Sequence, residues 1–279
     1  MKYAFQWEDA VAVVSMSDPQ FVERVGAFLD IVPVATSAPG AVDVDVDVDD
    51  LSAGGFDVFF EGRCCHCENS EDCFLAVTTY VSASFLRKTC HLVLHSGAVS
   101  IDDQAVLFVG EPYAGKSLFA LTAWLEGVPV IGDDWIAIDC ENKTVIPFPK
   151  TFKPRLSFDS LSTDAQQKIA EAGFVEGRMH DVHRLVVSRQ ATGMLRYGER
   201  KPISRMVLLE RTEGTLSVSP LPSQDALEIL LSQVVPTKSG SVLAVLQVLE
   251  PLVNRAACHR LSIGENETRQ AVLRLLEPN

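Results

Sequence analysis

The segment that most constrains the fold of this chain is residues 110–117, which read Gly-Glu-Pro-Tyr-Ala-Gly-Lys-Ser. They fit the pattern G-x-x-x-x-G-K-[ST], in which backbone N–H groups and the start of a helix receive phosphate oxygens. Residues 104–109, of which all but Gln104 are apolar, predict a buried strand, and residues 118–126 have the composition of a helix. Because the motif is meaningful in the order strand, loop, helix, we expect a phosphate site in an α/β fold. The alternative is a chance Gly-Lys-Ser at the start of a helix.

This Gly-rich loop, residues 110–117, is expected to contact a bound nucleotide along its whole length. The residues concerned are Gly110, Glu111, Pro112, Tyr113, Ala114, Gly115, Lys116 and Ser117. Lys116 would reach the β- and γ-phosphates, and the Ser117 hydroxyl would ligate Mg²⁺. The expected cofactors are therefore ATP or GTP together with Mg²⁺, and the motif does not choose between the two nucleotides.

The composition excludes several classes of protein. A chain of 279 residues with 47% hydrophobic residues can build one large domain or two smaller ones around a sizeable core. The formal charge of −13 argues against a nucleic-acid partner, which would require a basic surface. No apolar run is long enough to span a membrane, and the N-terminus lacks a signal-peptide core, so a cytoplasmic protein is expected. The seven cysteines do not indicate a disulfide framework.

Two adjacent carboxylates follow the next predicted strand, residues 128–132. They are Asp133 and Asp134, and Asp133 lies seventeen residues after Lys116. Mg²⁺-nucleotide chemistry needs one carboxylate to hold the metal and another to accept the proton of an attacking hydroxyl. The sequence Gly-Asp-Asp also suits an ordinary turn, and the preceding Gly-rich loop favours the functional interpretation.

His95 lies fifteen residues before Gly110, after the apolar residues 92–94. Its position predicts that it ends a strand near the same catalytic edge. A lone histidine is more often a core or turn residue whose hydrogen bonds are satisfied within the fold. Only its position relative to the loop favours a functional role.

The His95 segment, the Gly-rich loop and the aspartate pair together resemble the catalytic domain of bacterial HPr kinase/phosphorylase and its smaller relatives. The resemblance covers about residues 92–155 and, more loosely, residues 258–264, Cys-His-Arg-Leu-Ser-Ile-Gly, before a predicted helix. It implies an α/β fold with a P-loop kinase core of the HPr-kinase-like type and a smaller N-terminal α+β region. It also implies transfer of a phosphoryl group to a serine-type hydroxyl of a peptide, protein or small molecule.

The resemblance assigns roles to the conspicuous side chains. Asp133 would be the catalytic base that activates the acceptor hydroxyl, and His95 would support the aspartate or the transferred phosphate. Asp134 and Ser117 would be the Mg²⁺ ligands, and Lys116 would hold the phosphates. The chain departs from the family at Tyr113, where glycine is usual, and it lacks the downstream signature of true HPr kinases. A nucleotide-binding module without turnover and an NTPase switch therefore stay open as alternatives, as does assembly into a homo-oligomer.

Residues 1–90 are expected to form a substrate- or partner-recognition region, and residues 91–279 the catalytic domain. Residues 42–49 alternate strictly between Val and Asp, which predicts an edge strand with a solvated acidic face. A Ca²⁺ or Mg²⁺ site is the alternative, and a flat row of carboxylates does not favour it. The acidic face, formed by Asp43, Asp45, Asp47 and Asp49, could attract a basic peptide.

Cysteines gather in residues 64–67, Cys-Cys-His-Cys, with Cys73 nearby at the start of a predicted helix over residues 73–88. The spacing does not match structural zinc sites, which pair ligands as C-x₂₋₄-C or H-x₃₋₅-H. We therefore expect no stoichiometric zinc and expect Cys73 to be a core residue.

Two further polar segments have open interpretations. Residues 147–155 hold three cations within a Pro-rich stretch, which could line an anionic substrate or be a solvated loop. A second cluster could sit on a mobile loop and supply a charge-stabilising arginine; it consists of Arg178, His180, His183 and Arg184.

The remaining predictions concern secondary structure. Strands are expected at residues 91–101, 105–109, 128–132, 135–139, 144–148, 183–188, 203–210 and 215–219. Helices are expected at about residues 19–29, 115–126, 160–172, 223–234, 241–256 and 266–276. Pro251 is expected to kink or split the helix at residues 241–256.

Overall fold

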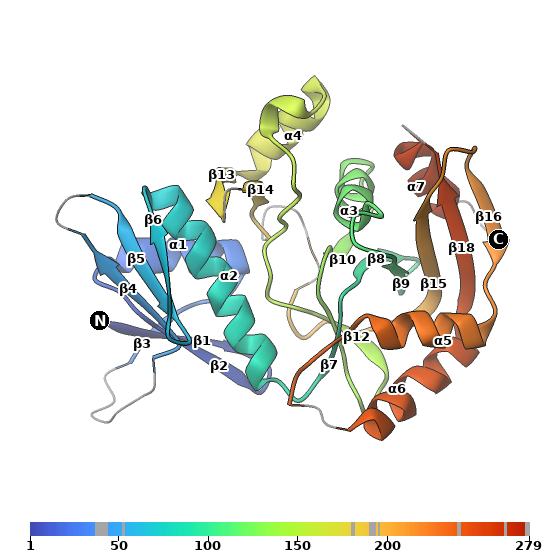
Figure 1. Cartoon of the computed structure of the whole chain (residues 1–279), viewed down its shortest axis with the longest axis horizontal. Coiled ribbons are helices and arrows are strands. Elements are labelled where there is room, and N and C mark those ends of the chain that lie inside the picture. Colours follow the sequence, from blue (N-terminus) through green and yellow to red (C-terminus); the bar gives the residue numbers. More distant parts are fainter. Residues whose placement is uncertain are drawn as a thin grey trace. The chain divides into compact units, whose positions relative to one another are not determined.

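The structure is a computed structural model that describes residues 1–36, 44–51, 54–179, 182–189, 194, 196–238, 241–264 and 267–276. The chain forms two compact units, one from Met1–Thr89 with Pro149–Thr192 and one from Cys90–Phe148 with Gly193–Asn279 (Figure 1). Both units mix helices and strands, as the expected α/β class requires. The expected boundary near residue 90 coincides with the first change of unit. The segment Pro149–Thr192 differs from expectation, because it groups with the N-terminal unit.

The first unit contains a sheet, a hairpin and three α-helices among its described residues. Its strands are β1 (Lys2–Trp7), β2 (Ala10–Ser15), β3 (Val34–Ala35), β4 (Val46–Asp50), β5 (Phe56–Phe60), β6 (Arg63–Cys67), β13 (Phe174–Met179) and β14 (Val182–Val187). Its helices are α1 (Pro19–Leu29), α2 (Ser70–Lys88), the 3₁₀ turn η1 (Phe158–Ser160) and α4 (Thr163–Ala172). The sheet has the strand order β3-β1-β2-β4-β5-β6, and β13 pairs with β14.

The end of the alternating acidic segment lies in β4, where Val46 and Val48 are buried and Asp47 and Asp49 lie on the opposite face. The expectation of an edge strand is wrong, because β4 pairs in parallel with β2 and in antiparallel with β5. The expected acidic face is also smaller than four carboxylates. Asp45 accepts hydrogen bonds from the Lys88 ammonium at 2.6 Å and from the Val13 N–H at 2.7 Å, and Asp43 lies outside the described residues.

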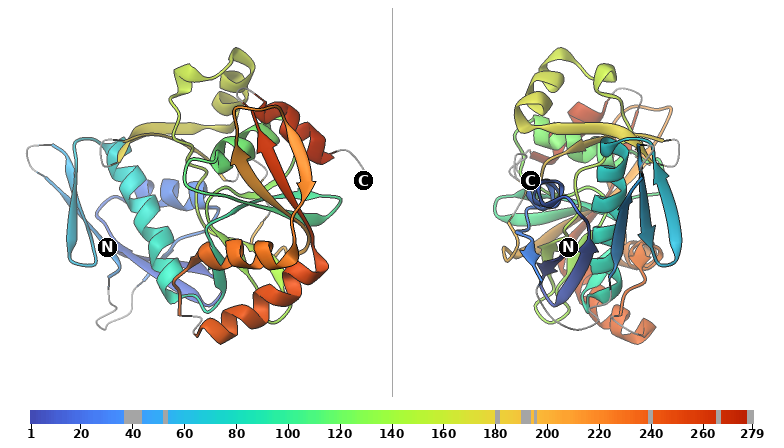
Figure 2. Two further views of the ribbon diagram at one scale, coloured as in Figure 1. Left: turned by 45° about the vertical axis from the view of Figure 1, so that its right-hand side comes forward. Right: turned by 90° about the vertical axis from the view of Figure 1, so that its left-hand side faces the viewer.

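Helix α2 lies along the sheet of the first unit and supplies much of its core (Figure 2). It begins at Ser70 because the Asn69 side chain accepts the Asp72 N–H, which caps the first turn. Cys73 is fully buried, as expected of a core residue. Aromatic rings pack edge to face in this core, and the ring centres of Trp7 and Phe85 lie 6.1 Å apart.

The second unit contains a larger sheet and four α-helices among its described residues. Its strands are β7 (Leu92–Leu94), β8 (Gly97–Ile101), β9 (Gln104–Val109), β10 (Val130–Gly132), β11 (Ile136–Ile138), β12 (Thr144–Pro147), β15 (Lys201–Arg211), β16 (Ser217–Pro220), β17 (Val234–Val235) and β18 (Ala257–Ile263). Its helices are α3 (Lys116–Leu125), α5 (Ser223–Ser232), α6 (Val242–Arg255) and α7 (Thr268–Leu276). The strand order is β10-β8-β9-β15-β12-β11-β7-β17, and β18 pairs with both β15 and β16.

Both faces of this sheet are covered by helices (Figure 1). Successive side chains of β9 point to opposite faces, so Leu107 joins the core cluster formed with Leu230 of α5 and Leu249 of α6. Phe108 points the other way and packs on Phe119 of α3, with ring centres 5.2 Å apart. A strand buried on both faces reads as a continuous apolar run, which is why the sequence predicted β9 well.

Two predicted elements of this unit differ in the structure. The strand expected at residues 91–101 is broken into β7 and β8 by residues 95 and 96. The helix expected at residues 241–256 is not split by Pro251, because α6 runs through it to Arg255. No described helix is long and apolar enough to cross a membrane.

Candidate functional site

The strand directions bring the predicted site segments to one edge of the sheet in the second unit. β8 runs antiparallel to both of its neighbours, β9 and β10, so β9 and β10 run in the same direction. The Gly-rich loop follows the end of β9, and the aspartate pair follows the end of β10. His95 lies just before β8, which starts where β9 ends, since Gly97 pairs with Phe108. With one strand between them, β9 and β10 lie about 10 Å apart.

Glycines shape the two ends of the Gly-rich loop. A Cβ atom on Gly110 would lie 2.6 Å from the Leu209 carbonyl oxygen, so the backbone of β15 approaches too closely for a side chain. Gly115 is the N-cap residue of α3 and has φ of 96°, a conformation that favours glycine. It offers no side chain to cap the first turn of α3, in contrast to Asp18 in α1 and Asn69 in α2. The start of α3 therefore suits an external anion.

The Lys116 side chain folds back across the loop. Its ammonium donates hydrogen bonds to the Gly110 carbonyl oxygen at 2.7 Å and to the Glu111 carbonyl oxygen at 3.2 Å. The side chain is buried, and this burial lowers the pKa of Lys116, against the opposing charge of Glu111. These carbonyl partners are neutral, so the ammonium charge is available to a phosphate. Ser117, the next residue, is half-buried in the first turn of α3.

Tyr113 has φ of 69°, in the left-handed region, and its side chain is 83% exposed. The glycine usual at this position in the resembled family would adopt this conformation without steric strain. For tyrosine the strain is on the order of 1 kcal/mol.

We expect Tyr113→Gly to raise the free energy of unfolding by up to about 1 kcal/mol, because it relieves the backbone strain while losing little buried area. The measurement is urea unfolding monitored by circular dichroism. Tyr113→Ala is the matched control: it removes the same ring but keeps Cβ, and it should give no gain. Equal stability of the two variants would show that the backbone at Tyr113 is unstrained.

His95 and Asp134 meet in the structure. His95 Nε2 lies 2.8 Å from Asp134 Oδ1, and both side chains are partly exposed. The backbone N–H of His95 donates to the Gln233 carbonyl oxygen at 2.7 Å, which fixes the histidine where β7 ends. The sequence left open whether His95 serves the aspartate, and the structure pairs it with Asp134. Asp133 itself is 4% exposed, at the end of β10.

These residues fit a Mg²⁺-polyphosphate. Gly115 starts α3 without a side-chain cap, Lys116 contributes a cation held by neutral carbonyls, and two carboxylates lie at the same edge of the sheet. Magnesium usually takes only one or two protein ligands, with phosphate oxygens and water completing the octahedron. Ser117 and Asp134 are the residues that would hold it.

Arg211 was not among the residues predicted from the sequence. It ends β15, which runs parallel to β9, and its guanidinium lies against Gly115: a Cβ on that glycine would be 2.5 Å from Nη2. No sequence motif marks it. Its place depends on β15 pairing with β9, which the sequence does not specify.

Lys153 and Arg178, from the other two candidate segments, make contacts within the first unit. Lys153, from the cationic stretch at residues 147–155, donates to Thr78 Oγ1 at 2.9 Å and to Thr79 Oγ1 at 2.7 Å on α2. The Arg178 N–H donates to Asp72 Oδ1 at 2.7 Å, and Arg178 pairs with His183 in the β13–β14 hairpin. His180, and the side chain of His183, lie outside the described residues.

The cysteine cluster does not converge on one point. Residues 63–67 form β6, so Cys65 and Cys67 share one face while Cys64 and His66 share the other. His66 Nδ1 lies 3.0 Å from Asp57 Oδ1, and the hydrogen bond between Cys67 and Cys73 raises the pKa of the Cys67 thiol. Among the described residues no group of three or more His, Cys, Asp or Glu is arranged to hold a metal. The expectation of no zinc stays a prediction, which metal analysis of the purified protein would check.

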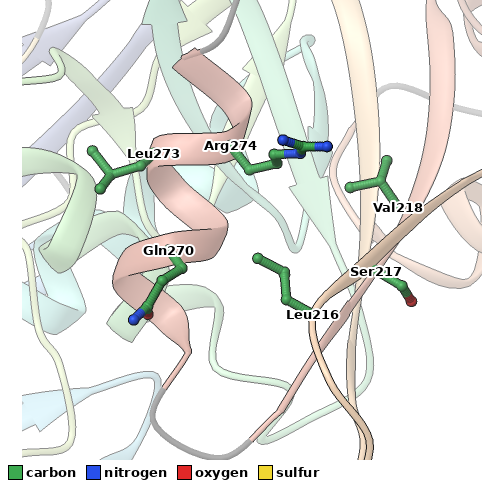
Figure 3. A pocket seen from close by; sticks show the side chains of 6 residues that line it. All are labelled: Leu216, Ser217, Val218, Gln270, Leu273 and Arg274. Atoms are coloured by element: carbon green, nitrogen blue, oxygen red, sulfur yellow. The ribbon is translucent and has the colours of Figure 1, made fainter.

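A cavity of about 490 Å³ lies between α7 and the start of β16 in the second unit (Figure 3). It is lined by Leu216, Ser217, Val218, Gln270, Leu273 and Arg274. At 100° per residue, Gln270 and Leu273 lie on the side of α7 opposite Thr268, which contacts Arg211. The cavity is thus separate from the Gly-rich loop, and it contains none of the predicted site residues.

Comparison with known proteins leaves the family of this chain open. No protein-family description matches the sequence, and no curated protein matches it. Among solved structures, the HPr(Ser) kinase/phosphatase from Coxiella burnetii matches with 16% sequence identity and a TM-score of 0.26. The match covers 58% of this chain and 93% of that one. Because the TM-score is so low, this likeness carries no argument about fold or function.

Proposed function

We propose that this protein is a nucleotide-dependent phosphotransferase that moves a phosphoryl group from ATP or GTP, with Mg²⁺, to a serine-type hydroxyl of a peptide, protein or small molecule. The observation that carries the proposal is the meeting of three segments at one edge of the second unit's sheet: the Gly-rich loop, the Asp133–Asp134 pair and His95. In open α/β sheets, ligands bind outside the carboxyl ends of the strands, and β9 and β10 both end at this edge.

The loop and its helix bind and orient the phosphates in this proposal. Lys116 exchanges its contacts with the Gly110 and Glu111 carbonyls for contacts with phosphate oxygens. The positive end of the α3 dipole also attracts the phosphates. When bound, Mg²⁺ neutralises part of the phosphate charge.

The two aspartates divide the remaining work. Asp134 Oδ1 lies 2.8 Å from His95 Nε2, and in this proposal the Asp134 carboxylate is a ligand of the metal. Asp133 is the base that takes the proton of the acceptor hydroxyl, and its burial shields the transfer from bulk water. His95 keeps Asp134 in one orientation, so it acts as a positioning residue.

A nucleotide-binding module without turnover is the second candidate. Tyr113 favours it, because an exposed ring on a left-handed residue replaces the glycine that the resembled kinases use at the fourth loop position. Nucleotide affinity without transfer to any hydroxyl would identify such a module. An NTPase switch would instead transfer to water and would need a water-orienting residue, which neither the sequence nor the described residues single out.

Mg²⁺-nucleotide is expected to raise the thermal stability of the protein. A ligand that binds only the native state stabilises it by about 2.7 kcal/mol at 100 times its dissociation constant. The measurement is a thermal-shift panel with ATP, GTP, ADP and pyrophosphate, each with and without Mg²⁺. Adenosine, which lacks phosphate, is the control and should give no shift. If none of the phosphate compounds shifts the melting temperature, the chain does not bind nucleotides and the proposed function fails.

A further inference from the structure

The guanidinium of Arg211 lies directly beside the Gly-rich loop. β15 pairs in parallel with β9, and Leu208 stands opposite Val109, the last residue before the loop. Three residues after Leu208, β15 ends at Arg211. A Cβ atom built on Gly115 would lie 2.5 Å from Arg211 Nη2 and 3.2 Å from both Cζ and Nε. The Arg211 guanidinium therefore occupies the space that the Cβ atom of any other residue at position 115 would need.

A single neutral contact anchors this guanidinium among the described residues. Arg211 Nη2 donates to Thr268 Oγ1 at 3.2 Å, and Thr268 is a buried residue at the start of α7. A guanidinium carries five N–H donors, so one hydroxyl satisfies only a small part of its capacity. The rest of the side chain is exposed.

Two arginines of the second unit are paired with carboxylates, whereas Arg211 is not paired with one among the described residues. Arg269 of α7 pairs with Glu126 at 2.6 Å, and Arg260 of β18 approaches Glu210 at 3.6 Å. Within the described part of the chain no carboxylate forms an ion pair with Arg211. Arg211 is therefore a cation beside the loop whose charge is not compensated by an ion pair among the described residues.

We propose that Arg211 is a second phosphate-binding cation of this site, which contacts the polyphosphate of the nucleotide together with Lys116. The inference rests on the proposed function, because it requires a polyphosphate on the Gly-rich loop. A planar guanidinium can donate two parallel hydrogen bonds to one phosphate, which a lysine cannot. Thr268 is the positioning residue that holds the guanidinium at the loop.

Binding of inorganic tripolyphosphate with Mg²⁺, measured by isothermal titration calorimetry, tests the proposal with a probe that has no base or sugar. Arg211→Ala should weaken binding about tenfold to a hundredfold, the range for a charge-assisted hydrogen bond. Arg211→Lys should recover only part of that loss. Arg255→Ala is the matched control, since it removes one exposed positive charge from the same unit at the end of α6, and it should change the affinity less than about twofold.

A double-mutant cycle tests the role of Thr268. Thr268→Val should weaken tripolyphosphate binding several-fold in the parent protein and have no effect in the Arg211→Ala background, because the side chain that it positions is then absent. A thermal melt of each variant without ligand shows whether it folds. If Arg211→Ala binds tripolyphosphate as tightly as the parent while Lys116→Ala does not bind it, the inference is wrong and the proposed function stands. If the parent binds neither tripolyphosphate nor ATP, both are wrong.

Discussion

Asp133→Asn is expected to lower phosphoryl transfer about 10²- to 10⁴-fold while nucleotide binding is retained, because the amide keeps the size of the carboxylate but cannot accept the proton of the acceptor hydroxyl. Phosphoryl transfer requires little covalent chemistry from the protein, so positioning and charge stabilisation account for most of the rate enhancement. Asp133 is 4% exposed, so the proton transfer that it is proposed to carry out is shielded from bulk water. The measurement is transfer of labelled γ-phosphate to the acceptor, or to water where no acceptor is known.

Two neighbouring substitutions serve as comparisons for Asp133→Asn. Asp134→Asn should weaken the Mg²⁺ dependence of nucleotide binding as well as the rate. His95→Ala should cause an intermediate loss, because it removes the partner 2.8 Å from Asp134 but leaves both carboxylates in place. Transfer by Asp133→Asn at the parental rate would show that the base has been assigned wrongly. Absence of transfer by the parent itself would favour the binding module.

Lys116→Ala is expected to abolish the thermal shift caused by nucleotide, because it removes the cation that the loop holds on its own carbonyl oxygens. Lys116→Met is the matched variant, since it keeps an apolar stem in the buried position and removes only the charge. Both variants should melt cooperatively without ligand. A normal shift in Lys116→Met would mean that the ammonium does not contact the phosphates.

The same lysine predicts a pH dependence of binding. Burial lowers the pKa of Lys116, so its charged form is lost at a lower pH than that of an ordinary lysine. Phosphate binding requires the charged form, and therefore the affinity of the parent should fall as the pH rises through this lowered pKa. Titration calorimetry of the parent across the alkaline range would detect this fall, and an affinity that stays constant through the range would contradict the prediction.

Features that depend on short stretches of chain could be predicted from the sequence. The apolar run before the Gly-rich loop became β9, and the helix after the loop became α3. The Val–Asp alternation correctly indicated which side chains of β4 are buried. In each case the period of the side chains, or a spacing within one motif, contains the needed information.

Features that depend on which strands are neighbours could not be predicted in this way. A period of two residues indicates which face of a strand is buried, but it does not indicate what lies beside the strand. The interior place of β4, and the grouping of Pro149–Thr192 with the first unit, depend on contacts between distant parts of the chain.

The candidate site shows the same division. The sequence alone determined the Gly-rich loop, the aspartate pair and His95, because a local motif or a strand end marks each of them. Only the tertiary structure decided that His95 pairs with Asp134 and that Arg211 lies against Gly115. The physical reason is that these contacts arise from the order and direction of β8, β9, β10 and β15 in one sheet. That order is set by the packing of the whole unit and not by any short segment.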